Sequence, residues 1–121
     1  MNQIQNILTD KGSKYAASGA EAMSKKDVDR FLAKLTSKKK YAKATHNTWA
    51  VVLSDGTCLK SDDGESGAGM IILNVLKREE VFDHLVVVTR WYGGVHLGAD
   101  RFRHVKTCVY EYVTTFFSKD K

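Results

Sequence analysis

The chain contains no proline and only two cysteines among its 121 residues. Cys58 and Cys108 lie far apart in the sequence and belong to no CxxC pair, so they match neither a zinc-binding pattern nor a thioredoxin-like redox pattern. Isolated cysteines of this kind are typically reduced, buried thiols. Because free thiols are typical of proteins from reducing compartments, we expect a cytoplasmic location.

Long hydrophobic runs and linker sequences are also missing. No apolar stretch approaches the roughly 18 residues that a membrane-spanning helix needs. The first residues, MNQIQNILTDKG, lack the charged start and apolar run of a signal peptide. No low-complexity, repeated or proline-rich segment divides the chain. We therefore predict a single domain over residues 1–121, with its core at about 7–117, and no membrane association.

The charge is unevenly distributed along the chain, whose formal net charge is +5. Residues 25–43 carry eight basic and two acidic side chains, a net +6, whereas residues 55–65 carry a net −3. Segregated charge of this kind attracts partners of opposite sign. The exposed face of a helix predicted over residues 24–40 is therefore a candidate basic surface, formed by Lys34, Lys38, Lys39 and Lys40.

Hydrophobic periodicity predicts an α+β fold. Val28, Phe31, Leu32 and Leu35 recur at helical spacing, and the run TWAVVL followed by SDG is typical of a strand that enters a hairpin. The predicted order is β-β-α-β-β-α-β-α, in which helices cover one face of a four- or five-stranded sheet as a two-layer sandwich. The predicted elements are strands 4–8 and 13–18, helix 24–40, strands 48–53 and 57–60, helix 66–78, strand 84–89, and a last helix that includes Phe102 and Phe116.

The segment TRWYGGVHLGADRFRH, residues 89–104, is the strongest candidate for a binding loop. Gly93 and Gly94 would let another group approach the main chain closely. The start of the last helix, near Gly98, would favour an anion through its free amide groups. Arginines at the strand end and in the helix could then hold a phosphate or a carboxylate: Arg90, Arg101 and Arg103. The alternative is that these arginines are solvated and that Trp91 and Tyr92 belong to the core.

A second segment, KSDDGESGAG at residues 60–69, is acidic. Asp62, Asp63 and Glu65 precede or open a predicted helix, where the helix dipole stabilises each carboxylate by roughly 0.3–1 kcal/mol. Clustered oxygens could also bind a divalent cation, but the spacing does not match the calcium-binding loop, and we predict no metal. The favoured interpretation is a salt bridge to Arg90 or Arg101 that holds the two glycine-containing loops side by side.

The four histidines form no recognisable catalytic motif. His46 precedes the third strand, and His84, His96 and His104 are scattered. HExxH is absent, and the spacing defines no Ser-His-Asp or Cys-His arrangement. Asn47, beside His46, could tie a loop through its side chain. We therefore predict no cofactor and regard an enzymatic function as uncertain.

Four blocks of the sequence together resemble the conserved domain of the Impact family, which is shared with the bacterial YigZ-like proteins. The blocks are ILTDKGSKYAA, KATHNTWAV, SDDGESGAG and VVVTRWYGGVHLGADRFRHV, and they occur in the family's order from about Ile7 to Tyr112. RWYGG followed by LGADRF is similar to the eukaryotic branch. The resemblance implies a fold like that of the second domain of ribosomal protein S-five.

The resemblance also implies a function and a surface. Impact-type proteins regulate translation under stress by competing for the activator of a kinase that phosphorylates an initiation factor, and they also bind actin. No established enzymatic activity comes with the family. Its animal and fungal members carry an additional RWD domain that this chain lacks, so the chain is either a single-domain member or a fragment. The motif residues implied in binding are His46, Asn47, Asp62, Asp63, Gly64, Glu65, Arg90, Tyr92, Gly93, Gly94, Gly98, Arg101 and Arg103.

Three functional hypotheses follow from these observations. The first is a non-catalytic module that binds a ribosome-associated protein, the ribosome or RNA. The second is an actin-binding or signalling module that uses the lysines of helix 24–40. The third is an enzyme that acts on a phosphorylated or nucleotide substrate, with Asp63, Glu65 or His46 as the general base. The predicted binding site is a cleft edge formed by residues 46–47, 61–65 and 90–101, and replacing Arg90 and Arg101 together is expected to abolish binding in a folded domain.

Overall fold

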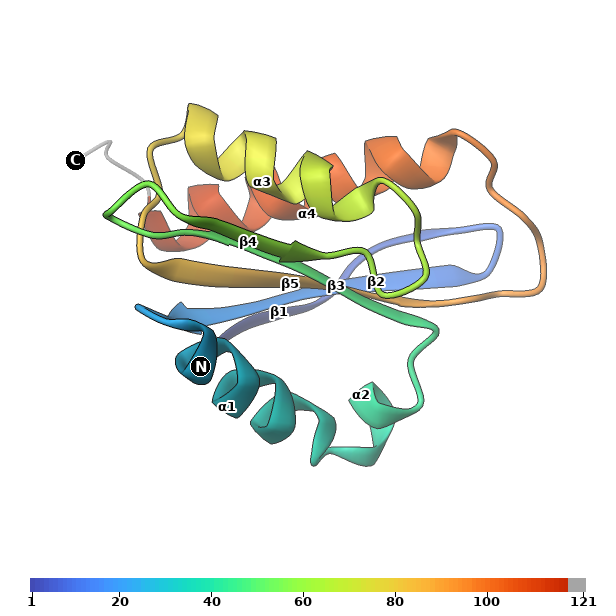
Figure 1. Cartoon of the computed structure of the whole chain (residues 1–121). Helices are drawn as coiled ribbons and strands as arrows, with labels where there is room; N and C mark the ends of the chain where they lie inside the picture. The colour runs from blue at the N-terminus through green and yellow to red at the C-terminus, as the bar shows by residue number, and fades with distance from the viewer. Residues whose placement is uncertain (118–121) are drawn as a thin grey trace.

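A computed structural model describes residues 1–117 of the chain. Its five strands form one antiparallel sheet in the order β1-β2-β5-β3-β4 (Figure 1). The predicted α+β class and the predicted order of elements are confirmed, with one short additional helix, α2. The elements are β1 (Asn2–Asp10), β2 (Ser13–Glu21), α1 (Lys25–Thr36), α2 (Lys39–Ala42), β3 (His46–Val52), β4 (Cys58–Ser61), α3 (Ala68–Arg78), β5 (His84–Trp91) and α4 (Asp100–Phe117).

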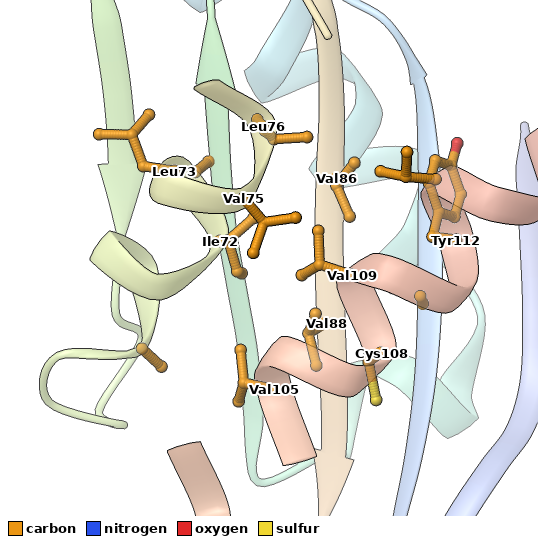
Figure 2. Close-up of a cluster of buried hydrophobic side chains, with 14 of the residues drawn as sticks. Ile72, Leu73, Val75, Leu76, Val86, Val88, Val105, Cys108, Val109 and Tyr112 are labelled. Atoms are coloured by element: carbon orange, nitrogen blue, oxygen red, sulfur yellow. The ribbon is translucent and has the colours of Figure 1, made fainter. Parts of the chain in front are cut away.

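The larger hydrophobic core lies between the sheet and helices α3 and α4. Val86 and Val88 of β5 point to this side because alternate residues of a strand face the same side of a sheet. Figure 2 shows them against Ile72 of α3 and Val109 of α4. Tyr112, which is fully buried, closes the core at one end. On this face, α3 and α4 therefore pack on the sheet as one helical layer.

The opposite face of the sheet is covered by α1 and α2, so the expectation that all helices share one face is wrong (Figure 1). Leu85 and Val87, which alternate with Val86 and Val88, belong to this second core together with Phe31 of α1. A strand that is apolar at consecutive positions needs cover on both faces. The run HLVVVT meets that condition, which explains why β5 lies at the centre of the sheet.

The helix predicted over residues 24–40 is interrupted. Ser24 caps α1, because its hydroxyl accepts a hydrogen bond from the amide of Asp27. The helix ends at Thr36, and Lys38 has an extended backbone conformation before α2 begins. Tyr41, only 2% exposed, anchors α2 in the second core. Lys34 and Lys40 therefore belong to different helices rather than to one basic face.

The β1–β2 hairpin brings a tight turn to the end of the sheet where the candidate site lies. Asp10 pairs with Ser13, and both intervening residues, Lys11 and Gly12, have positive φ angles of 49° and 83°. Positive φ at both positions is the requirement of the type I′ turn, which matches the twist of an antiparallel pair. The first two predicted strands thus form a hairpin with Gly12 in its turn. Across residues 1–117, no helix combines the length and the hydrophobicity that a membrane crossing requires.

Candidate binding cleft

The two candidate loops lie at the same end of the sheet. The acidic loop connects β4 to α3, and the glycine- and arginine-containing loop connects β5 to α4; both lie on the right of Figure 1. The strand β3, which begins at His46, starts at this end as well and pairs with both β4 and β5. Antiparallel pairing therefore places residues that are distant in the sequence around one cleft.

A buried ion pair joins the two loops. Arg90 Nη1 lies 2.6 Å from Glu65 Oε2, and the two side chains are 6% and 2% exposed. The predicted salt bridge between the loops is thus present, with Glu65 and Arg90 as its members. Arg90 Nη2 also contacts the Ser13 hydroxyl at 3.5 Å, which links the pair to the β1–β2 turn. A pair this deeply buried fixes the two loops relative to each other, because separating the charges would leave each without compensation.

The acidic loop is also tied to the start of β3. The Asp63 carboxylate accepts a hydrogen bond of 2.6 Å from the amide of Asn47. The carbonyl of Asp63 accepts from His46 Nδ1 at 2.8 Å. A carbonyl can only accept, so Nδ1 carries the proton and Nε2 faces Glu65 Oε2 at 3.9 Å. These contacts hold Asp63 in a left-handed conformation with a φ of 46°.

Asp62 stabilises the beginning of α3 rather than facing the cleft. Its two carboxylate oxygens accept hydrogen bonds from the amides of Gly67 and Gly69, at 2.9 and 2.8 Å. These amide hydrogen bonds lower the pKa of Asp62 below its ordinary value, because they favour the charged carboxylate. The predicted interaction between an acidic residue and the helix start is therefore present, and Asp62 provides it.

The glycine pair of the second loop has two different roles. Gly93 packs directly on the β1–β2 turn, where an added Cβ would overlap the main chain of Gly12 and Ser13. Its amide donates to the Ser13 hydroxyl at 3.2 Å. Gly94 has a φ of +95° but an open surrounding. Close approach thus requires a glycine at position 93, and backbone conformation favours one at position 94.

Between the loops lies an open cleft of about 370 Å³. The Glu65–Arg90 pair forms its floor. The rim residues include His46, Gly64, Tyr92, His96, Gly98 and Arg101. The amide of Tyr92 donates to Thr45 Oγ1 at 2.9 Å, so the main chain beneath this 43% exposed side chain is fixed. The cleft therefore combines a rigid floor with an exposed rim, as binding sites commonly do.

The electrostatic character of the cleft depends on Arg101. Glu65 compensates the charge of Arg90, but no carboxylate within residues 1–117 forms an ion pair with Arg101. The guanidinium of Arg101 lies 4.7 Å from the centre of the Phe102 ring. In the same described region, the buried Nε atoms of Arg90 and Arg101 have no hydrogen-bond partner. The cleft thus presents the positive charge of Arg101, which suits an anionic partner.

Several predicted binding residues lie outside the cleft lining. Arg103 points to the surface and pairs with Asp100 at 3.3 Å. Asn47 bridges the main chain of Tyr41 and the hydroxyl of Thr89 through its side chain, so the predicted loop tie is present. The other predicted residues without a place in the lining are Asp62, Asp63, Gly93, Gly94, Lys34, Lys38, Lys39 and Lys40.

The start of α4 offers fewer free amides than expected. The amides of Asp100, Arg101 and Phe102 donate to the carbonyls of residues 97–99, in a tight first turn. A turn of this kind satisfies amide groups that would otherwise be available at a helix start. Anion binding at Gly98 would therefore depend on the Arg101 side chain rather than on the helix end.

Sequence reasoning missed Thr45 as a cleft residue, and it included His96 and Leu97 only within the predicted segment 90–101, without naming them. The apolar side chain of Leu97 in this loop was a sequence signal for burial, and the residue is 7% exposed. His96 packs against Tyr92, with ring centres 5.5 Å apart. Thr45 carries no signal in the sequence, because its place depends on the pairing of β3 with β5. Among residues 1–117, no three His, Cys, Asp or Glu side chains gather in a way that could hold a metal ion.

The fold and the cleft define an α+β domain with an open cleft at one end of its sheet. The sequence profile described as the Impact N-terminal domain matches residues 11–113. The chain is 43% identical over 108 residues to the Protein IMPACT homolog of Caenorhabditis elegans, covering 82% of this chain and 41% of that protein. It is 41% identical over 106 residues to the human Protein IMPACT, covering 84% of this chain and 33% of that protein. The chain therefore belongs to the Impact family and spans about a third to two fifths of the length of these relatives.

Two solved structures are similar to the fold. One, described as a hypothetical protein, superimposes with a TM-score of 0.77 at 23% identity and covers 90% of this chain and 55% of its own. The other is the two-domain translational regulator Yih1, with a TM-score of 0.57 at 34% identity, covering 89% of this chain and 44% of its own. The first similarity concerns the fold alone. The second connects the fold with a protein described as a translational regulator.

Proposed function

We propose that this chain is a non-catalytic binding module that regulates translation by docking a component of the translation machinery at the cleft. Membership of the Impact family and similarity to the translational regulator Yih1 support the proposed process. The cleft supports the proposed mode of action. Its exposed rim, which includes Tyr92 and Arg101, rests on a floor fixed by the Glu65–Arg90 pair. A rigid surface loses little conformational entropy when a partner binds.

The observation that carries the proposal is that the carboxylates of the acidic loop are already engaged. Glu65 pairs with Arg90, Asp62 caps α3, and Asp63 accepts from Asn47. A general base must be within reach of a substrate proton and free to take it. The arrangement therefore favours recognition over turnover, and the arginine-containing rim is the part of the cleft that remains available to a partner.

Within translation, we propose the stress-kinase pathway as the point of action. The relatives with which the chain shares its motifs are about twice as long or more. The module would therefore act as one part of a larger assembly, or alone with a lower affinity for its partner. Phosphorylation of the initiation factor in amino-acid-starved cells is the corresponding measurement. Expression of the chain is expected to lower that phosphorylation, and an unchanged level would contradict this branch of the proposal.

The general proposal can be tested in a cell-free translation system. Addition of the purified chain is expected to change the output of a reporter in a concentration-dependent manner. The double variant Tyr92→Ala/Arg101→Ala removes the exposed ring and the uncompensated charge from the rim, and it is expected to lose most of this effect.

A matched control removes the same two chemical types elsewhere. Phe82, 51% exposed, belongs to the loop between α3 and β5, which lies at the opposite end of the sheet (Figure 1). Lys106 belongs to α4 and lines a groove shared with α3. The Phe82→Ala/Lys106→Ala variant should act like the unmodified chain. Equal activity of the two double variants, or a reporter output that never responds to the chain, would contradict the proposed function.

A further inference from the structure

A second hollow of about 350 Å³ lies directly beside the cleft. Its lining comes from the β1–β2 hairpin, from α2 and from the end of β5: Asn6, Gly12, Lys14, Lys40, Trp91 and Tyr92. Tyr92 lines both this hollow and the cleft. An exposed aromatic ring therefore stands between two hollows of similar volume.

The cations of the second hollow are held in defined positions. Lys14 lies opposite Trp91 across the β2–β5 pair. Lys40 Nζ lies 5.1 Å from the centre of the Trp91 ring, and the indole Nε1 donates to the Lys40 carbonyl at 2.9 Å. Within residues 1–117, neither lysine forms an ion pair with a carboxylate. Both positive charges are thus available to a ligand, on the side of Tyr92 opposite to Arg101.

The Tyr92 ring is presented to solvent from a fixed main chain. Its amide is bonded to Thr45 Oγ1, and its ring packs against His96 at an angle of 38°. The side chain nevertheless remains 43% exposed. An ordered, half-exposed ring flanked by cations is the combination that proteins use to bind single-stranded nucleic acid, because bases stack on the ring and phosphates lie near the cations.

We infer that Tyr92 and the two flanking hollows bind single-stranded RNA, with one nucleotide on each side of the ring. Lys14 and Lys40 would contact the phosphate on one side, and Arg101 would contact the phosphate on the other. The inference rests on the proposed function in so far as it takes RNA as the nucleic acid. An acidic peptide is the competing partner, but it would use the three cations and leave the exposed ring between the hollows without a role.

The number of cations sets the expected salt dependence. For single-stranded nucleic acid, log K falls by roughly 0.7 per log unit of salt for each neutralised phosphate. With about three such contacts the slope is about −2, so affinity should fall roughly 20-fold between about 50 and 200 mM salt. Removal of one cation should reduce the slope by about 0.7.

Fluorescence anisotropy with a labelled oligouridine of about ten nucleotides tests the inference on the full chain. Tyr92→Leu, which removes stacking but keeps an apolar side chain, is expected to weaken binding about five-fold or more, whereas Tyr92→Phe should retain most of the affinity. Lys40→Gln should flatten the salt dependence. Phe82→Leu and Lys106→Gln, which make the same chemical changes away from the hollows, should leave both quantities unchanged. Matching circular dichroism spectra would show that each variant is folded.

Three outcomes would overturn the inference: no binding of the oligouridine at low salt, equal losses in the control variants, or an affinity that is unaffected by Tyr92→Leu. Competition by polyglutamate as strong as that by unlabelled RNA would instead identify an acidic protein partner. If RNA binding is absent but the Tyr92→Ala/Arg101→Ala variant still loses its effect in cell-free translation, the proposed function stands with a protein partner. RNA binding without any effect on translation would leave the RNA site and refute the proposed function.

Discussion

Replacement of Arg90 by alanine would leave the Glu65 carboxylate buried without its partner. The two side chains are 6% and 2% exposed, and the distance between Arg90 Nη1 and Glu65 Oε2 is 2.6 Å. Breaking a buried pair by removing one member typically costs about 3–5 kcal/mol. Because small domains have a total unfolding free energy of about 5–15 kcal/mol, this single change should remove a large fraction of the stability. This prediction differs from the sequence-based expectation, in which the double Arg90 and Arg101 variant loses binding but stays folded.

Urea denaturation of single and double variants of the ion pair measures this effect. Arg90→Ala alone should lower the unfolding free energy by about 3–5 kcal/mol. Arg90→Met combined with Glu65→Leu should cost much less, because apolar residues of similar volume replace both charges at once. Arg101→Ala, on the rim, is expected to change stability by less than about 1 kcal/mol. A cost below about 1 kcal/mol for Arg90→Ala, or a double variant as unstable as the single one, would refute the reasoning.

Three further predictions concern the surroundings of the cleft. Gly93→Ala should destabilise the domain by about 1–3 kcal/mol, since the new Cβ overlaps the main chain of Gly12; Gly94→Ala, which meets only backbone strain, should cost about 1 kcal/mol in the same urea titration. Asp62→Ala should cost about 1 kcal/mol by removing the cap of α3, and since the folded-state pKa of Asp62 is lowered, the contribution of its carboxylate should be present above pH 3.8 and lost below it in a pH series of unfolding curves. Burial lowers the pKa of His84 from 6.5 to about 4, so the unfolded chain takes up a proton first and stability should fall as the pH drops from about 6.5 to about 4; a His84→Gln variant with the same pH dependence would contradict this.

The sequence predicted the junction of the two loops because it depends on local signals. Gly93, Gly94 and the acidic run mark loops, and a strand between two apolar-faced helices brings such loops to one end of a sheet. Opposite charges in the two loops then suggested the salt bridge that Glu65 and Arg90 form. The apolar face of α1 was also predicted from a local signal, the helical spacing of its apolar residues. Val28, Phe31 and Leu35 are buried, which confirms that prediction.

The remaining features depend on tertiary packing. Periodicity identifies the apolar face of α1 but not the side of the sheet that it covers, which explains the error about one helical layer. Nor does the sequence distinguish Arg90 from Arg101, because each is an arginine three residues from a glycine of the same segment. The structure buries Arg90 in the cleft floor and leaves Arg101 on the rim. Lys14 and Lys40 flank Tyr92 only through strand pairing and the position of α2, which no local pattern indicates.

Line broadening of the amide NMR signals of the labelled chain, titrated with the ribosome fraction of a translating extract, tests the central claim most directly. Docking at the cleft predicts that broadening begins at residues 45–46, 64–65 and 91–98, and that the outer side of α3 and α4 is affected last. Broadening that begins on α3 and α4, or spectra that do not change at any concentration of the fraction, would contradict the account.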